Sequence, residues 1–270
     1  ADAAHCEVSE PHLCMSRRRT EGSPAQAQGD TFGNNGTNNN VTVSVNQIIG
    51  CNIGDGNNIN IFTSNSAGDI LVGTAAGGSL NATGTITLDA GRDVIFKGGA
   101  NTAVGTVSVA SSRDIIVADN ADASLTTNGD ISFNALDGIV VGNNGVGTVL
   151  SNTGNIAMVA FGASGSGTNN LEIGANSGAS GSRVEATDGQ VNLVTISSTS
   201  EIQVGDGGDG SVIAGTNIFA TTFGTGSDID VGDDGGVGTV LAGGDIVFIS
   251  SNGVSVGDDS LGTVRSTNGN

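Results

Sequence analysis

The chain has 270 residues, of which 46 are glycine and none is tryptophan or tyrosine, and its formal net charge is −19. This charge and the single lysine predict that nucleic acid is not a partner, because phosphate binding needs clustered lysine and arginine. No run of about 18 apolar residues is present, so no membrane-spanning segment is expected.

The first 40 residues are predicted to form a flexible or extended leader. They hold the only basic run, at residues 17–19, and a low-complexity asparagine-rich run at 34–40. Residues 41–69 are predicted to be an N-terminal capping region with strands at 41–45 and 59–61. A cap is expected because the terminal coil of a repeat structure is otherwise an open sheet edge.

A short motif recurs through residues 70–270. Two aliphatic residues stand two positions apart and are followed by glycine, as in the tetrapeptide Ile-Asp-Val-Gly that begins at residue 229. Copies begin at residues 70, 139, 171, 202, 229 and 254, with weaker copies at 94 and 115, so that successive copies are 21 to 32 residues apart. Self-similarity at such a period predicts a solenoid in which each repeat forms one coil.

Two further aliphatic motifs follow in each repeat, as in Thr239-Val240 and Asp245-Ile246. Each motif alternates apolar and polar residues, which is typical of a short strand with one buried face. Glycine, asparagine and aspartate fill the gaps between motifs, as tight corners require. We therefore predict an all-β solenoid over residues 70–270, with about three short strands per coil, roughly eight coils, and parallel pairing between coils.

An antiparallel sandwich is the alternative architecture, because it also has short strands at regular spacing. It does not explain why the three motifs recur in the same order. The short coil from 94 to 115 is expected to have one strand missing or merged, and the longer coils to carry loops near 162–170 and 174–182. The solenoid is expected to be open at its C-terminal end, where a longer chain or another subunit would continue it.

Six aspartates are candidate calcium ligands. Three of them directly follow the glycine of consecutive repeats, and stacking would bring their carboxylates to about 5 Å, which is unfavourable unless a cation or solvent intervenes. Calcium prefers carboxylate and carbonyl oxygens. The alternative is that these side chains are solvated turn residues that splay apart. The six residues are Asp206, Asp233 and Asp258 after the glycine, with Asp209, Asp234 and Asp259 nearby.

The three cysteines are Cys6, Cys14 and Cys51. In an extracellular setting an odd number favours one disulfide among three possible pairings, or a bond between molecules. A zinc site that also used His5 and His12 would have a spacing that matches no standard arrangement, and the alternative is an unstructured segment.

No catalytic constellation is apparent in the repeats. Enzymes that act on polysaccharides need carboxylate acid–base pairs, or calcium with a basic residue, and usually aromatic platforms for the sugar rings. Both histidines precede the repeats, and Arg92, Lys97 and Arg113 lie beside Asp93 and Asp114, where surface ion pairs are expected. The chain is therefore predicted not to be an enzyme.

The segment TGTITLDAGRDV at residues 83–94 resembles the repeats of filamentous haemagglutinin-like adhesins, as do the Gly-Asp-Ile triplets that begin at residues 68, 129 and 244. The resemblance covers roughly residues 60–270, and the motifs of the family's secretion domain are not visible. It implies a right-handed parallel β-helix exported to the surface of Gram-negative bacteria.

The predicted function is therefore an extracellular or cell-surface structural β-solenoid, as a segment of an adhesin or a subunit of a filament or surface layer. Its expected partners are copies of itself or further repeats of a longer chain, stacked at the solenoid ends, and host or surface glycans are further candidates. The alternative function is a calcium-dependent β-helix that binds or cleaves polysaccharides.

Overall fold

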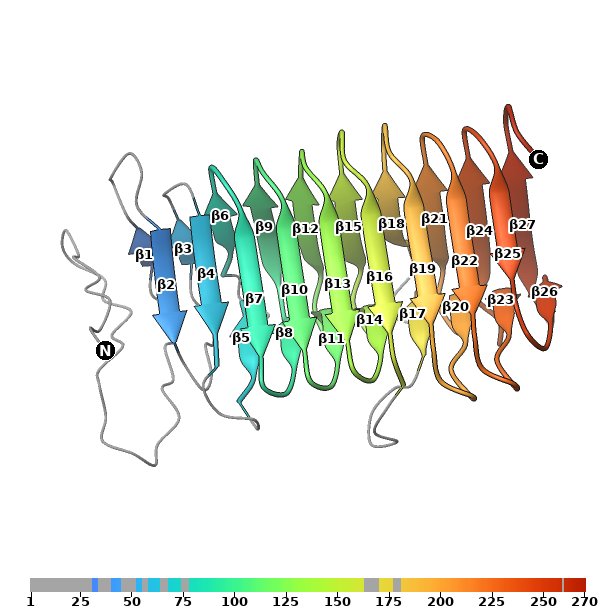
Figure 1. Cartoon of the computed structure of the whole chain (residues 1–270), viewed down its shortest axis with the longest axis horizontal. Coiled ribbons are helices and arrows are strands. Elements are labelled where there is room, and N and C mark those ends of the chain that lie inside the picture. Colours follow the sequence, from blue (N-terminus) through green and yellow to red (C-terminus); the bar gives the residue numbers. More distant parts are fainter. Residues whose placement is uncertain are drawn as a thin grey trace.

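The protein is a solenoid of parallel β-strands, shown by a computed structural model in Figure 1. The structure describes residues 31–33, 40–44, 52–54, 58–63, 68–73, 78–162, 170–176, 181–258 and 260–270. In these residues the only regular elements are strands. No helix long and apolar enough to cross a membrane occurs in this part of the chain.

The strands form three parallel sheets, which we call A, B and C. In order of stacking, sheet A consists of β1 (Thr31–Gly33), β3 (Asn52–Gly54), β6 (Leu80–Ala82), β9 (Gly99–Ala103), β12 (Ala123–Thr127), β15 (Gly147–Ser151), β18 (Ser182–Ala186), β21 (Gly210–Ala214), β24 (Val237–Ala242) and β27 (Leu261–Ser266). Sheet B consists of β2 (Asn40–Ser44), β4 (Asn58–Phe62), β7 (Ile86–Ala90), β10 (Val107–Ser111), β13 (Ile131–Ala135), β16 (Ile156–Ala160), β19 (Val191–Thr195), β22 (Ile218–Thr222) and β25 (Ile246–Ile249). Sheet C consists of β5 (Ile70–Val72), β8 (Val94–Phe96), β11 (Ile115–Asp119), β14 (Ile139–Asn143), β17 (Leu171–Ile173), β20 (Ile202–Asp206), β23 (Ile229–Asp233) and β26 (Val254–Val256).

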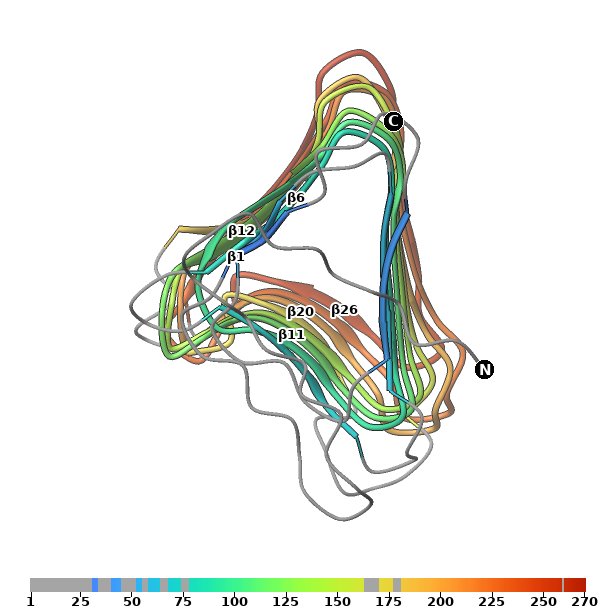
Figure 2. The same ribbon diagram turned by 90° about the vertical axis from the view of Figure 1, so that its left-hand side faces the viewer.

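The chain visits sheets B, C and A in turn and then moves one step along the axis. Seen from the N-terminal end in Figure 2, this path runs clockwise and away from the viewer, so the helix is right-handed. The predictions of a parallel β-helix with three strands per coil and about eight coils are therefore confirmed. The alternative of an antiparallel sandwich is wrong, because β10, for example, pairs in parallel with both β7 and β13.

The predicted loss of a strand in the short coil is wrong. The coil contains β8, β9 and β10, and β9 pairs in parallel with β12 and β6. The aliphatic pattern fails here because the inward side of β9 carries Asn101 and Ala103. Asn101 is fully buried, and its side chain accepts a hydrogen bond from the Leu80 backbone amide (2.8 Å) and donates one to the Ser124 carbonyl (3.0 Å). A buried polar side chain that is satisfied by both neighbouring coils can replace an aliphatic one.

The two strands expected in residues 41–69 lie in the same stack as the repeats. They correspond to β2 and β4, which pair with each other, and β4 pairs with β7 of the repeats. Of the segments expected to absorb the longer period, residues 163–169 and 177–180 lie outside the described residues.

The interior is a narrow column of aliphatic side chains. Residues alternate between buried and partly exposed positions along most strands, as in β16, and the same position stacks from coil to coil because the pairing is in register. In sheet B one such column includes Leu88, Phe133 and Leu193, each at most 1% exposed. This burial is the main stabilising term available to a chain that has few aromatic residues.

The glycine of the repeat motif turns the corner between sheets C and A. Its φ is positive in every copy that carries it, for example +78° at Gly205, and glycine adopts this conformation without strain. In the weak copy at residue 115 the place is taken by Ala118, which has a φ of 69°. Its neighbours in register show the equivalence, because Val117 pairs with Val141 and Asp119 with Asn143, which flank Gly142.

Asparagine and aspartate connect consecutive coils at the other corners. The aspartates of the three Gly-Asp-Ile triplets each accept a hydrogen bond from a backbone amide of the next coil. Asp69 accepts from the amide of Asp93 (3.3 Å), and Asp130 accepts from that of Asn155 (2.7 Å). Asp245 accepts from that of Asn270 (2.8 Å). The triplets that carry the family resemblance are therefore coil-to-coil connectors, since they satisfy amides that the turns leave free.

Candidate functional site

The acidic corner lies where β20, β23 and β26 end. Asp206 and Asp233 are partners in the register of β20 and β23, as the sequence predicts. Because Val231 pairs with Val256, the same register places Asp258 on the next coil. Partial burial raises the pKa of Asp206, and the charges of Asp234 and Asp233 raise it further. The carboxylates thus repel one another along the axis.

Two of the predicted ligands instead bind backbone amides. Asp209 accepts a hydrogen bond from the Val237 amide (3.2 Å), and Asp233 accepts one from the amide of Asp234 (2.8 Å). Among the described residues no group of three or more acidic, histidine or cysteine side chains is arranged to hold a metal ion. Calcium binding at this corner therefore stays a prediction. The other residues singled out in the sequence, Asp259, Cys6, Cys14, Cys51, His5 and His12, lie outside the described residues.

A second polar row, missed by the sequence analysis, follows the outer face of sheet C. The middle residue of the repeat motif points outward, and it is apolar in the first four coils, with Val140 the last of them. From β17 onward the same position holds a polar residue, so the change is visible in the motif itself. The polar residues are Glu172, Gln203, Asp230 and Ser255.

Hydrogen bonds connect this row to the neighbouring strand starts. The Asn170 amide donates to Glu172 (3.3 Å) and to Gln203 (3.2 Å), and Gln203 donates to Glu201 (3.0 Å). Burial raises the pKa of Glu172 to about 7, against the opposing effect of the Asn170 hydrogen bond. Burial is also the main cause that raises the pKa of Glu201 and of Asp230. The row and its neighbour Glu201 therefore hold carboxyl groups with raised pKa values, and the pKa of Glu172 lies near neutral pH.

Three of the five cationic residues in the described part of the chain lie near sheet C in the N-terminal coils. Arg92 donates to Asp69 (2.6 Å) and Arg113 donates to Asp93 (2.7 Å). The Asp93 side chain is only 3% exposed, so this pair is more buried than the surface ion pair that the sequence predicts. Burial raises the pKa of the neighbouring Asp114 to about 6, although its carboxylate accepts a hydrogen bond from the Gly138 amide (3.1 Å).

Replacing Arg113 by glutamine is expected to lower the free energy of unfolding by about 2 kcal/mol, because the buried Asp114 loses its cation and the buried Asp93 keeps only Arg92, 3.6 Å away. Urea unfolding followed by circular dichroism measures the change. The matched control is Arg183→Gln, since the Arg183 side chain is 43% exposed and pairs with a single carboxylate, that of Glu185, so the loss should stay near or below about 1 kcal/mol. Equal losses in the two variants would contradict a structural role for the Arg113 pair.

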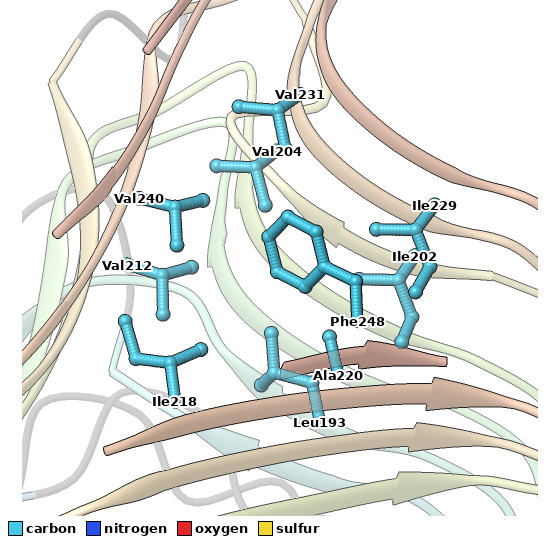
Figure 3. A pocket seen from close by; sticks show the side chains of 10 residues that line it. All are labelled: Leu193, Ile202, Val204, Val212, Ile218, Ala220, Ile229, Val231, Val240 and Phe248. Atoms are coloured by element: carbon cyan, nitrogen blue, oxygen red, sulfur yellow. The ribbon is translucent and has the colours of Figure 1, made fainter. Parts of the chain in front are cut away.

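A small gap in the interior lies near the last coils and is lined by side chains of all three sheets. Phe248 of β25 points into it between the aliphatic residues of the neighbouring coils (Figure 3). Every lining residue is apolar, so the gap offers no group that could orient a polar substrate. It is an imperfectly filled part of the core close to the last coil.

No protein-family model matches the chain, and neither the curated proteins nor the solved structures yielded a significant match.

Proposed function

We propose that the protein is an extracellular structural β-solenoid, which serves as a stiff spacer and assembly module in a bacterial surface adhesin, filament or surface layer. The repeat resemblance supports the extracellular location. The continuous parallel ladders support the spacer role, since each described coil is hydrogen-bonded to its neighbours in all three sheets from β5 to β26. Bending such a rod would break several ladders at once.

The exposed side chains of the last coil support the proposed role in assembly. Its core-facing residues are exposed, with Val254, Val256 and Val264 at 46%, 48% and 37%, whereas their partners one coil earlier are buried. β25, β26 and β27 are the outermost strands of their sheets at this end (Figure 1). Such an edge pairs readily with a further strand in register. The next coil of a longer chain, or the first coil of another copy, would cover it.

Electron microscopy of the purified 270-residue chain tests the assembly role. Filaments that grow along the solenoid axis are expected for the parent protein, and Val264→Lys should abolish them by placing a charge in the buried column. The control is Thr263→Lys, whose side chain points outward from the same strand. Monomeric rods at all concentrations would contradict self-assembly and leave only the spacer role within a longer chain.

The alternative function is a calcium-dependent protein that binds or cleaves polysaccharides. One observation favours it, because a carboxyl group whose pKa is near 7, as for Glu172, suits a general acid. Release of oligosaccharides from a panel of glycans, lost in Glu172→Gln, would support this function over a purely structural role. Calcium titration of the parent protein and of Asp206→Asn tests the acidic corner.

A further inference from the structure

The outer face of sheet B becomes apolar toward the C-terminal coils. Five strands, β13, β16, β19, β22 and β25, each contribute three outward side chains: two within the strand and the next outward residue after it. Together they form a lattice of fifteen side chains. Ten of the fifteen are apolar and none is charged. The equivalent positions on β7 and β10 are polar or small, and they include Asp89. We call the lattice on β13 to β25 the apolar face.

Its most exposed row follows the corner between sheets B and C. Leu136, Phe161, Ile196 and Phe223 occupy equivalent positions in four consecutive coils. The backbone amide of each donates to the carbonyl of the last strand residue one coil earlier, for example from Phe161 to Ala135 (3.0 Å). The side chains therefore stack at about 4.8 Å and form a continuous ridge.

These side chains are exposed to an unusual degree for large apolar residues. Phe223 is 65% exposed, and Ile249 on the neighbouring row is 55% exposed. Val159 and Val194 fill the same row on β16 and β19 and are partly exposed. A contiguous exposed apolar patch of this kind marks an interaction surface, because monomeric soluble proteins rarely leave one uncovered.

The charge distribution restricts the partner. Residues 114–270 hold 18 acidic and two basic residues, a net charge of −16, yet none of these charges lies within the apolar face. Sheet C by contrast presents Glu172 and Asp230 on its outer side, and sheet A presents Arg183 and Glu185. Two copies of this acidic rod can thus meet on sheet B without bringing carboxylates into contact.

We infer that the apolar face binds a second copy of the chain, so that two rods pack laterally through their B sheets about a two-fold axis. Sheet B is the straightest side of the cross-section in Figure 2, and flat sheets pack face to face at about 10 Å. Five strands at about 4.8 Å and a width of five residues at about 3.3 Å give a footprint of about 24 by 17 Å. Two such faces bury roughly 800 Å² in total, which is the size of a weak, reversible interface.

Sugars and cationic partners fit this surface less well. A glycan site needs polar groups that orient the hydroxyls, whereas the row from Leu136 to Phe223 has only hydrocarbon. A cationic partner would bind the acidic outer side of sheet C instead. This inference does not depend on the end-to-end stacking proposed above, because a different face makes the contact.

Sedimentation velocity of the full chain over a wide concentration range tests the pairing. The measurement uses the Val264→Lys background, in which end-to-end growth is blocked. This protein is expected to form a dimer, and adding Phe161→Thr/Phe223→Thr should raise its dissociation constant by at least about tenfold. Threonine keeps the β-propensity of both positions, so far-ultraviolet circular dichroism should be unchanged. The matched control is Ile213→Thr/Leu241→Thr, which removes two apolar side chains from the outer face of sheet A and should dimerise normally.

Two further measurements separate lateral pairing from other causes. Val264→Lys, which blocks the end of the solenoid, should leave the dimer intact, and loss of the dimer in this variant would overturn the inference. Flotation with phosphatidylcholine vesicles tests a lipid surface as the occupant. Binding to vesicles that the Phe161→Thr/Phe223→Thr variant abolishes, or a parent protein that stays monomeric throughout, would also overturn it.

Discussion

Replacing Gly205 by alanine is expected to lower the free energy of unfolding by about 3 kcal/mol. Its φ of +78° costs an alanine about 1–2 kcal/mol. In addition, a Cβ atom at this position would lie 2.5 Å from backbone atoms of Val237 and Gly238, which cannot move without disturbing the ladder of sheet A. Overpacking of this kind typically adds about 1–3 kcal/mol. Urea unfolding followed by circular dichroism measures the loss.

Ala118 provides the matched control, because it is the one alanine that holds the equivalent position with a positive φ among the described repeats. Ala118→Gly should stabilise the protein by up to about 1 kcal/mol, since it relieves the left-handed strain at some cost in chain entropy. A loss in Gly205→Ala no larger than the change at Ala118 would show that the corner relaxes around a side chain.

The protein is expected to be more stable at pH 5 than at pH 8, and Glu172→Gln should remove a large part of this difference. The pKa of Glu172 rises from 4.5 to about 7 on folding because the group is buried. A raised carboxyl pKa means that the folded state binds the proton more tightly, so this stabilisation is complete below pH 4.5 and is lost as the pH rises through 7. A shift of this size corresponds to about 3 kcal/mol.

Asp114 should contribute in the same direction between pH 4 and about 6, because burial raises its pKa to about 6. Thermal or urea unfolding at a series of pH values measures both groups. Asp188→Asn is the control for the loss of one negative charge, since it removes a carboxylate from an exposed turn. A Glu172→Gln variant with the parent protein's pH dependence would contradict the assignment.

The coil architecture could be predicted from the sequence because each of its sequence signals is local. Ile229 and Val231 alternate with polar residues and are followed by Gly232, and this pattern reports one buried face and one corner without reference to any other coil. The strand β9 could not be predicted in this way. Asn101 is stable inside the core only because Leu80 and Ser124, one coil away on either side, complete its hydrogen bonds.

The candidate site was predictable only in part, for the same reason. The stacking of Asp206 and Asp233 follows from the repeat, so the sequence predicted it. The row with Glu172 was missed although the change from apolar to polar residues is visible in the motif, because the proton affinity of Glu172 arises only from burial in the assembled coil. The apolar face was missed because Phe161 and Phe223 are 62 positions apart in the sequence, with Ile196 between them.

The sequence by itself determined that this chain winds into parallel coils with an aliphatic interior, since the period of the apolar residues encodes which face of each strand is buried. The tertiary structure decided which side chains of different coils lie together: the Asp93–Arg113 pair, the polar row on the outer face of sheet C and the apolar face of sheet B. The physical reason is that neighbours in the stack are 20 to 35 residues apart along the chain, so their charges and surfaces combine only after the register between coils is fixed.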